Sequence, residues 1–140
     1  MKVIFLDLDG PLFDNGEFIK EASYCLSELV RLTGAKIVIT SDWRIGKDVN
    51  QVMSRLSVSL GITTLEVIGI TDVVYHNSHE IPRGAEIKLW LEEHLEDIES
   101  YVIIDDSEDS ALVSMSSHLV LTGKQGFQGG CFREALRILG

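Results

Sequence analysis

The sequence predicts an α/β fold in which five parallel strands form one sheet with helices on both faces, a three-layer arrangement. Short apolar runs of the β type alternate along the chain with longer stretches whose apolar residues recur at helical spacing. Glycines and an Asn-Ser cluster separate these runs, and no hairpin signal joins successive strands. A strand that is not joined to the next by a hairpin reaches it through a crossover, so we expect a parallel sheet covered on both sides.

The first three predicted elements lie within the first 40 residues. Residues 2–6 are predicted as a strand, and the segment "EFIKEASYCLSELVRLTG" (17–34) is predicted as a helix that stops at Gly34. The segment "KIVIT" (36–40) is predicted as the second strand. The apolar residues of the predicted helix that keep helical spacing are Phe18, Ala22, Cys25, Leu29 and Leu32.

The middle of the chain is predicted to contain a second helix and a third strand. Asp48 is placed to cap this helix, which ends at Gly61. The third strand is expected over "LEVIGI" (65–70), and a polar loop is expected over residues 71–82.

The last part of the chain begins with a predicted helix that opens at Arg83. Ile87, Trp90, Leu91 and Leu95 form its apolar face. The remaining elements are expected to be a strand at 101–104, a short helix at 107–115, a strand at 118–122 and a closing helix at 131–139.

Composition and charge limit the classes of partner. The 140 residues are the size of one domain, so we expect a single domain over residues 1–140. The formal charge of -10 opposes broad attraction to nucleic acid or anionic lipid, although a local basic patch is compatible with it. No stretch has the length of a membrane span or the pattern of a signal peptide, so we expect a cytoplasmic protein with no membrane partner.

Polar residues follow three of the predicted strands, at the edge where a parallel sheet binds its ligands. These residues are Asp7 and Asp9 after the first strand, Thr40 and Ser41 after the second, and Asp105 and Asp106 after the fourth. Four carboxylates at one edge cannot all remain ionised without a cation. Oxygen ligands of this kind favour Mg²⁺, which is therefore the predicted cofactor.

The order of these motifs resembles that of the haloacid dehalogenase (HAD) superfamily of phosphotransferases. The segment "DLDGPLFD" comes first, "IVITS" follows, Arg83 then opens a helix, and a strand ends in "IIDD". The segments "KIVITSDWR", "RGAEIKLWL", "YVIIDDSED" and "HLVLT", with a Gly-rich segment after them, resemble the HAD domain of Swiss Army Knife RNA repair proteins. The resemblance implies a Rossmann-like fold. Pro11 departs from the usual motif and offers no N–H to a ligand.

The resemblance also implies a role for each site residue. Asp7 would be the nucleophile that forms an aspartyl-phosphate, and Asp9 would be the general acid and base. Asp7, Asp106 and the backbone carbonyl of Asp9 would hold the metal. Ser41 and Arg83 would bind the transferring phosphoryl group, and Asp105 would be an additional ligand or would support the others.

Four alternatives remain open at this stage. Thr40 competes with Ser41 as the phosphate-binding hydroxyl, and Lys88 competes with Arg83 as the basic residue. Asp109 either lies in the outer coordination shell of the metal or only stabilises the first turn of a helix through the helix dipole. Trp43 is a candidate for stacking on a base or sugar, and Arg44 is a candidate for pairing with an active-site acid or with a second phosphate.

The spacing of the motifs leaves no room for a cap domain. Helices and strands occupy both intervals in which such a domain is inserted, so we expect an open cleft that a partner or an oligomer can cover. The predicted function is Mg²⁺-dependent hydrolysis of a phosphomonoester, with a nucleotide or a nucleic-acid end as the favoured substrate. The alternatives are a phosphatase for sugars or metabolites and a catalytically silent domain that binds Mg²⁺.

Overall fold

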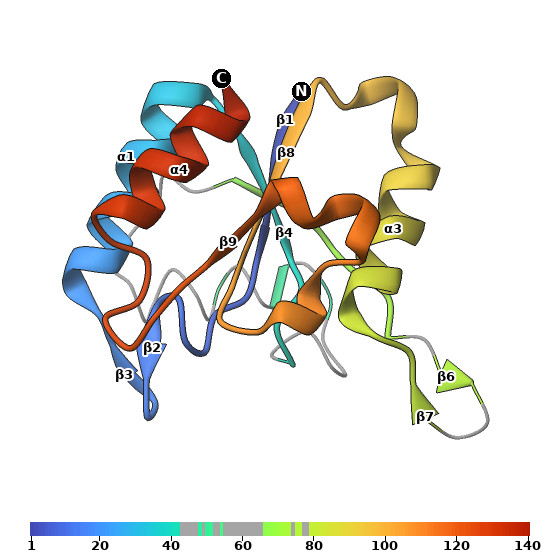
Figure 1. Ribbon diagram of the computed structural model, residues 1–140, viewed down its shortest axis with the longest axis horizontal. Coiled ribbons are helices and arrows are strands. Elements are labelled where there is room, and N and C mark those ends of the chain that lie inside the picture. Colours follow the sequence, from blue (N-terminus) through green and yellow to red (C-terminus); the bar gives the residue numbers. More distant parts are fainter. Residues whose placement is uncertain (43–47, 49, 52–53, 55–65, 74, 77–78) are drawn as a thin grey trace.

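Five parallel strands form the central sheet of the computed structural model, which describes residues 1–42, 48, 50–51, 54, 66–73, 75–76 and 79–140 (Figure 1). The strand order is β5-β4-β1-β8-β9, and every pairing in this sheet is parallel. The strands are β1 (Lys2–Leu6), β4 (Lys36–Ile39), β5 (Val67–Ile70), β8 (Ser100–Asp105) and β9 (Leu119–Leu121). This arrangement confirms the predicted fold.

The sheet order places a change of winding direction in the middle of the sheet. From β1 the chain moves outward through β4 to β5, and it then returns to the other side of β1 to form β8 and β9. Ligands of open α/β sheets bind at the carboxyl ends of the strands where the winding reverses. The ends of β1 and β8 are therefore the expected location of the site.

Helices cover both faces of the sheet (Figure 1). On one face α1 (Lys20–Thr33) and α4 (Gly130–Leu139) pack together over β1, β8 and β9. On the other face lies α3 (Arg83–Glu93). No further domain covers the carboxyl edge of the sheet in the described parts of the chain, and none of the helices found there is long and apolar enough to cross a membrane.

Alternation along β1 builds two separate apolar clusters. Ile4 and Leu6 pack toward α1 and α4, whereas Val3 and Phe5 pack toward α3, and all four side chains are fully buried. The ring of Phe5 meets that of Trp90 edge to face, with centroids 5.4 Å apart. Because both faces are buried, β1 is apolar from Val3 to Leu6, as expected of a central parallel strand.

A small hairpin precedes α1, and the sequence interpretation missed it. Strands β2 (Phe13–Asp14) and β3 (Glu17–Phe18) pair antiparallel across Asn15 and Gly16, whose φ angles are 51° and 80°. An Asn-Gly pair with positive φ at both positions forms the tight turn that hairpins favour. The predicted helix over 17–34 therefore begins at Lys20, and Phe18 lies in the hairpin.

Other segments also differ from their prediction. The expected loop over 71–82 contains a second short antiparallel pair, β6 (Tyr75–His76) and β7 (His79–Glu80). The expected helix over 107–115 is instead two 3-10 segments, η3 (Glu108–Ser110) and η4 (Val113–His118). Leu95, assigned above to the apolar face that begins at Arg83, lies beyond α3 in η2 (Leu95–Asp97) and is 71% exposed.

Most of the predicted helix over 48–61 lies outside the described residues, as do Trp43 and Arg44. Its predicted start can be examined. The N–H of Gln51 donates to Asp48 Oδ1 and the N–H of Asp48 donates to Gln51 Oε1, both at 2.9 Å. This reciprocal pair is the capping arrangement expected at a helix N-terminus.

The two core clusters predict a contrast between two leucines. Leu26 of α1 is fully buried, so Leu26→Ala should lower the free energy of unfolding by about 2–5 kcal/mol through lost burial and a residual cavity. The exposed Leu95 is the matched control, and Leu95→Ala should change the free energy of unfolding by less than about 0.5 kcal/mol. Urea denaturation of both variants measures the difference. Equal losses would contradict the assignment of the core.

Candidate active site

The register of the sheet brings three strand ends level with one another. Leu6 pairs with Ile39 of β4 and with Ile104 of β8. One step further, the N–H of Asp7 donates to the Ile104 carbonyl and the N–H of Thr40 donates to the Leu6 carbonyl, each at 3.0 Å. Thr40, Asp7 and Asp105 therefore follow these pairs at the same level of the sheet.

The direction of the acidic side chains follows from the alternation of side chains between the two faces of the sheet. Phe5 and Ile103 both belong to the cluster under α3. Asp7 and Asp105 come two residues after them, so the pleat directs these side chains toward the same face. Arg83, the first residue of α3, lies on that face.

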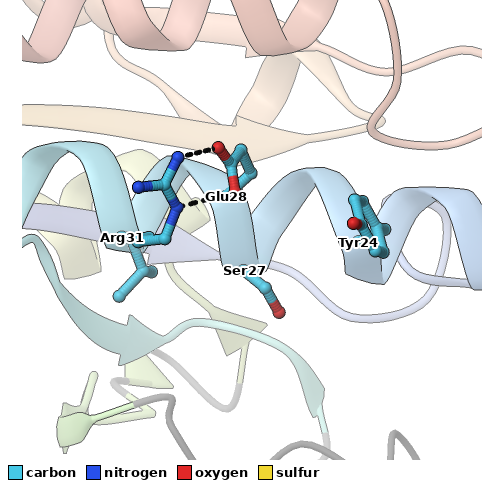
Figure 2. Close-up of a pocket in the computed structure, with 5 residues that line it drawn as sticks. Tyr24, Ser27, Glu28 and Arg31 are labelled. Carbon is cyan, nitrogen blue, oxygen red and sulfur yellow. Dashed lines mark hydrogen bonds and ion pairs between the residues drawn. The ribbon is translucent and has the colours of Figure 1, made fainter.

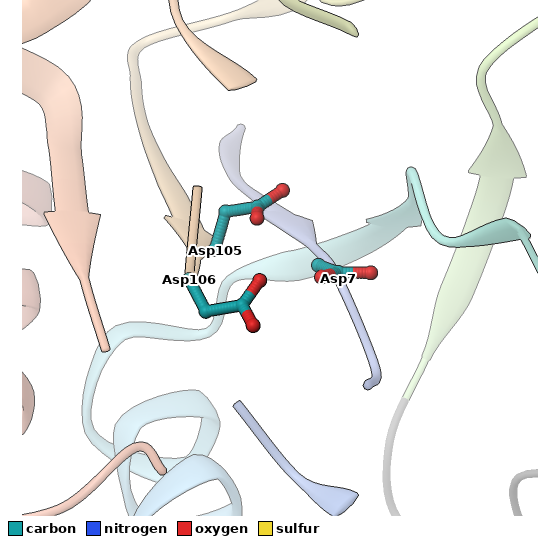
Figure 3. A group of neighbouring side chains, drawn as sticks. All are labelled: Asp7, Asp105 and Asp106. Carbon is teal, nitrogen blue, oxygen red and sulfur yellow. The ribbon is translucent and has the colours of Figure 1, made fainter. Parts of the chain in front are cut away.

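Three carboxylates converge at this point, from the ends of β1 and β8 (Figure 3). Oxygen atoms of Asp7, Asp105 and Asp106 lie within 4.8 Å of one another. Asp7 is 5% exposed and Asp105 is fully buried, whereas Asp106 is open to solvent. The cluster is thus a buried pair of acids with a third acid at its mouth.

Arg83 is the cation that the structure places against this cluster. Its Nη1 lies 3.0 Å from Asp105 Oδ2 and 3.5 Å from Asp7 Oδ1, and its Nη2 lies 3.4 Å from Asp42 Oδ1. The second oxygen of Asp105, Oδ1, accepts the N–H of Ser107 at 3.0 Å. Both oxygens of Asp105 are therefore engaged by the protein.

Burial and mutual repulsion disfavour ionisation of these acids. The pKa of Asp7 is raised to about 7, first by burial and then by the nearby Asp105, while Arg83 acts in the opposite direction. The pKa of Asp105 is also raised, chiefly by burial and against the effect of Arg83. Two buried carboxyls that resist ionisation beside a third acid form a site whose charge a divalent cation would balance.

The donor set and the available space fit Mg²⁺. All three side chains offer oxygen, which hard cations prefer. Gly10, the glycine of the D-x-D-G motif, leaves the room that Asp106 needs, since a Cβ at this position would lie 2.4 Å from Asp106 Oδ2. A larger residue at position 10 would displace that carboxylate.

The other predicted residues at this edge differ in exposure. Thr40 and Ser41 are buried directly after β4. Asp9 is exposed, and its side chain is not part of the group of three carboxylates. Asp109 is also exposed, and it lines a hollow of about 320 Å³ together with Arg83 and Asp42.

Lys88 is not brought to the site. It is exposed on α3 and lines a different hollow, with Ile98 and Tyr101. Five residues along a helix correspond to about one and two-fifths turns, so Lys88 and Arg83 leave α3 in different directions. Of these two basic residues, Arg83 is the one that contacts Asp7 and Asp105.

Sequence reasoning missed two residues near the cluster. Asp42 contacts Arg83, and its position directly after Ser41 in "TSDWR" was the available signal. Lys124 lines a hollow of about 370 Å³ that also contains Asp106 and Gly10. Its only sequence signal was a basic residue within the Gly-rich segment after the last strand.

Comparison with protein families gives one match. The model of the family described as "HAD domain in Swiss Army Knife RNA repair proteins" matches residues 3–129 of the chain. Neither curated proteins nor solved structures gave a match.

The raised pKa of Asp7 predicts how stability changes with pH in metal-free buffer. The pKa of about 7 keeps a proton on Asp7 in the folded protein up to about pH 7, whereas the unfolded chain releases it near the ordinary aspartate pKa of 3.8. The unfolded state therefore binds fewer protons between these values, and the free energy of unfolding should fall as pH rises from about 4 to about 7.

Asp7→Asn should flatten this fall, because it removes the titrating group and one of the crowded charges. Asp97→Asn, which changes an exposed acid of η2, is the matched control and should keep the wild-type slope. Urea denaturation in EDTA at several pH values measures the slopes. If the free energy of unfolding fell with pH at the same rate in the wild type and in Asp7→Asn, the pH dependence could not be attributed to the raised pKa of Asp7.

Proposed function

The chain belongs to the family of HAD domains found in Swiss Army Knife RNA repair proteins, and we propose that it hydrolyses phosphomonoesters with Mg²⁺ through an aspartyl-phosphate on Asp7. The family supports a phosphatase-type hydrolase in general terms. The observation that carries the finer proposal is the convergence of Asp7 and Asp106 beside the guanidinium of Arg83, at the point where the sheet changes direction.

The proposed metal site uses Asp7, Asp106 and the backbone carbonyl of Asp9. Asp105 completes the acidic cluster, but both of its oxygens already bind protein donors, so its proposed role is to hold Arg83 in place. When bound, Mg²⁺ would neutralise charge on the phosphoryl oxygens and keep Asp7 ionised. Asp106, the exposed member of the cluster, is open to a ligand from solvent.

Asp7 acts as the nucleophile in the first proposed step. One of its carboxylate oxygens forms a bond to phosphorus as the bond from phosphorus to the ester oxygen breaks. Asp9 gives its proton to the departing oxygen, and its exposure allows exchange of that proton with water. The products of this step are the free alcohol and a phosphorylated Asp7.

Water completes the proposed cycle. Asp9, now ionised, takes a proton from a water molecule, whose oxygen attacks phosphorus. The bond between phosphorus and the Asp7 oxygen breaks, and inorganic phosphate leaves. Arg83 and Ser41 are the proposed donors to the other phosphoryl oxygens, since Arg83 already lies 3.5 Å from Asp7 Oδ1.

This mechanism predicts metal-dependent turnover that requires Asp7. The purified protein should hydrolyse an aryl phosphate with Mg²⁺, and excess EDTA should abolish the reaction. Asp7→Asn should lower kcat by at least about 1,000-fold, because an amide cannot form the intermediate. Release of the aryl alcohol is the readout, and Asp97→Asn is the matched control with an expected kcat near that of the wild type.

Two outcomes would contradict the mechanism. Near-normal turnover by Asp7→Asn would exclude a covalent intermediate on this residue. Absence of turnover above a heat-killed control, with either Mg²⁺ or Mn²⁺, would favour a domain that only binds metal. Beryllium fluoride with Mg²⁺ provides a separate readout, because a protein that forms the phosphate-like adduct on Asp7 should melt at a higher temperature.

We propose a nucleotide or a nucleic-acid end as the source of the phosphomonoester. The matching family is described by its occurrence in RNA repair proteins, and no further domain encloses the carboxyl edge in the described ranges of the chain. An open edge admits a terminal phosphate on a large substrate. The formal charge of -10 favours recognition of such an end over a long electrostatic contact with the polynucleotide.

A substrate panel tests this preference. The values of kcat/KM should be higher for oligonucleotides with a 3′- or 5′-phosphate, or for mononucleotides, than for sugar phosphates and phosphopeptides. Moderate salt should reduce the preference for oligonucleotides more than the rate with the aryl phosphate. A sugar phosphate with a higher kcat/KM than every nucleotide substrate would instead identify a metabolite phosphatase.

A further inference from the structure

A second hollow adjoins the acidic cluster and shares Asp106 with it, and Arg83 does not line it. Its volume is about 370 Å³, within the range of small-molecule sites. Three separate segments line it: Gly10 and the hairpin residues Phe13 and Asp14, then Asp106, then residues 122–124. Because Asp106 belongs to both the hollow and the cluster, a group bound here would lie directly beside the proposed reaction centre.

The loop that contributes residues 122–124 to this hollow is fixed by backbone hydrogen bonds. The N–H of Thr122 donates to the Asp105 carbonyl at 2.9 Å, and the N–H of Phe127 donates to the Pro11 carbonyl at 2.8 Å. Between them the N–H of Gly126 closes a turn on the Gly123 carbonyl at 3.0 Å. Figure 1 shows this segment, which follows β9, descending beside β2 and β3.

Lys124 lies at the tip of that turn. It is exposed and lines the hollow, and it forms no ion pair with any residue that the structure describes. A different hollow on α1 shows the contrast, because there Arg31 is bound by Glu28 of the same helix, with Nε 2.9 Å from Oε2 (Figure 2). Among the described residues Lys124 is therefore a cation without a counterion, beside a cluster of acids.

The charge of the hollow depends on the neighbouring cluster. Two acids line it, and one of these, Asp106, belongs to the group of carboxylates that would share a bound cation. With that charge balanced, the exposed Asp14 and Lys124 are the remaining charged side chains of the lining. A flexible ammonium group is suited to an anionic group without a fixed orientation.

We propose that Lys124 binds a second phosphate of the substrate, one nucleoside away from the phosphate that Asp7 attacks. This inference rests on the proposed function and names the substrate class more closely: a nucleotide or polynucleotide end with at least two phosphates. The nucleoside that joins them occupies the hollow between Asp106 and Lys124. Lys124 is thus a specificity residue, and the reaction itself does not require its ammonium group.

Binding to a protein without the nucleophile tests the inference apart from turnover. In the Asp7→Asn background with Mg²⁺, adenosine 3′,5′-bisphosphate should bind about ten-fold more tightly than either adenosine monophosphate, which is the effect of one charge-assisted contact. Addition of Lys124→Ala should remove this difference. Lys88→Ala changes an exposed lysine at a different hollow, so it should leave the difference intact. Calorimetric titration provides each Kd.

A dinucleotide with a terminal 3′-phosphate distinguishes the two sources of the second phosphate. Preference for the dinucleotide over the monophosphate, lost with Lys124→Ala, assigns the contact to a phosphodiester of a polynucleotide, whereas preference for the bisphosphate alone assigns it to a free nucleotide. Equal binding of all these ligands to Asp7→Asn, or a preference that survives Lys124→Ala, would overturn the inference. Failure of the proposed function is seen separately, as absence of aryl phosphate turnover by the wild type.

Discussion

The crowding of Asp7, Asp105 and Asp106 is the constraint on which the site depends. Parallel pairing of β1 with β8 places the first two side by side, and both are withdrawn from water. Arg83 is shared among Asp7, Asp105 and Asp42, so it cannot neutralise them all. The pKa of Asp7 rises to about 7 because burial and its acidic neighbours outweigh the guanidinium. Excess negative charge in a site with little water strongly favours a cation.

The surrounding fold maintains this crowding instead of relieving it. The Ser107 N–H and Arg83 occupy the two oxygens of Asp105, which prevents that carboxylate from turning away. Gly10 leaves room for Asp106 where any side chain would meet it. Leu6 and Phe5 anchor β1 between the two apolar clusters, so the backbone that carries Asp7 cannot readily withdraw. A site held under like-charge repulsion lowers stability until a ligand binds, a cost that functional sites commonly carry.

Much of the fold followed from local patterns in the sequence. The apolar run of residues 3–6 marked the first strand, and the helical spacing within residues 17–34 marked α1. Local chemistry also explains the misses. Asn15 and Gly16 were a hairpin signal that the helical spacing of Phe18 obscured, so the start of α1 was placed too early. The segment from Ser107 to Met115 was predicted as one helix, but it forms short 3-10 segments, and the Leu112 backbone between them lies close against Gly84.

The sequence by itself determined the residue types of the site and their order along the chain, because strand ends in a parallel sheet meet at one edge whatever the details of packing. This rule predicted that Asp7, Ser41 and Asp105 lie at one edge, whereas Arg83 was expected there from the order of the family's motifs. Only the tertiary structure decided which charges touch. The contact of Arg83 with Asp7 and Asp105 depends on how α3 is oriented against the sheet. The binding of both Asp105 oxygens depends on the turn that follows β8. The position of Lys124 depends on a loop bonded to Pro11, more than 100 residues earlier. Distances of this kind arise from packing between elements, which no local pattern encodes.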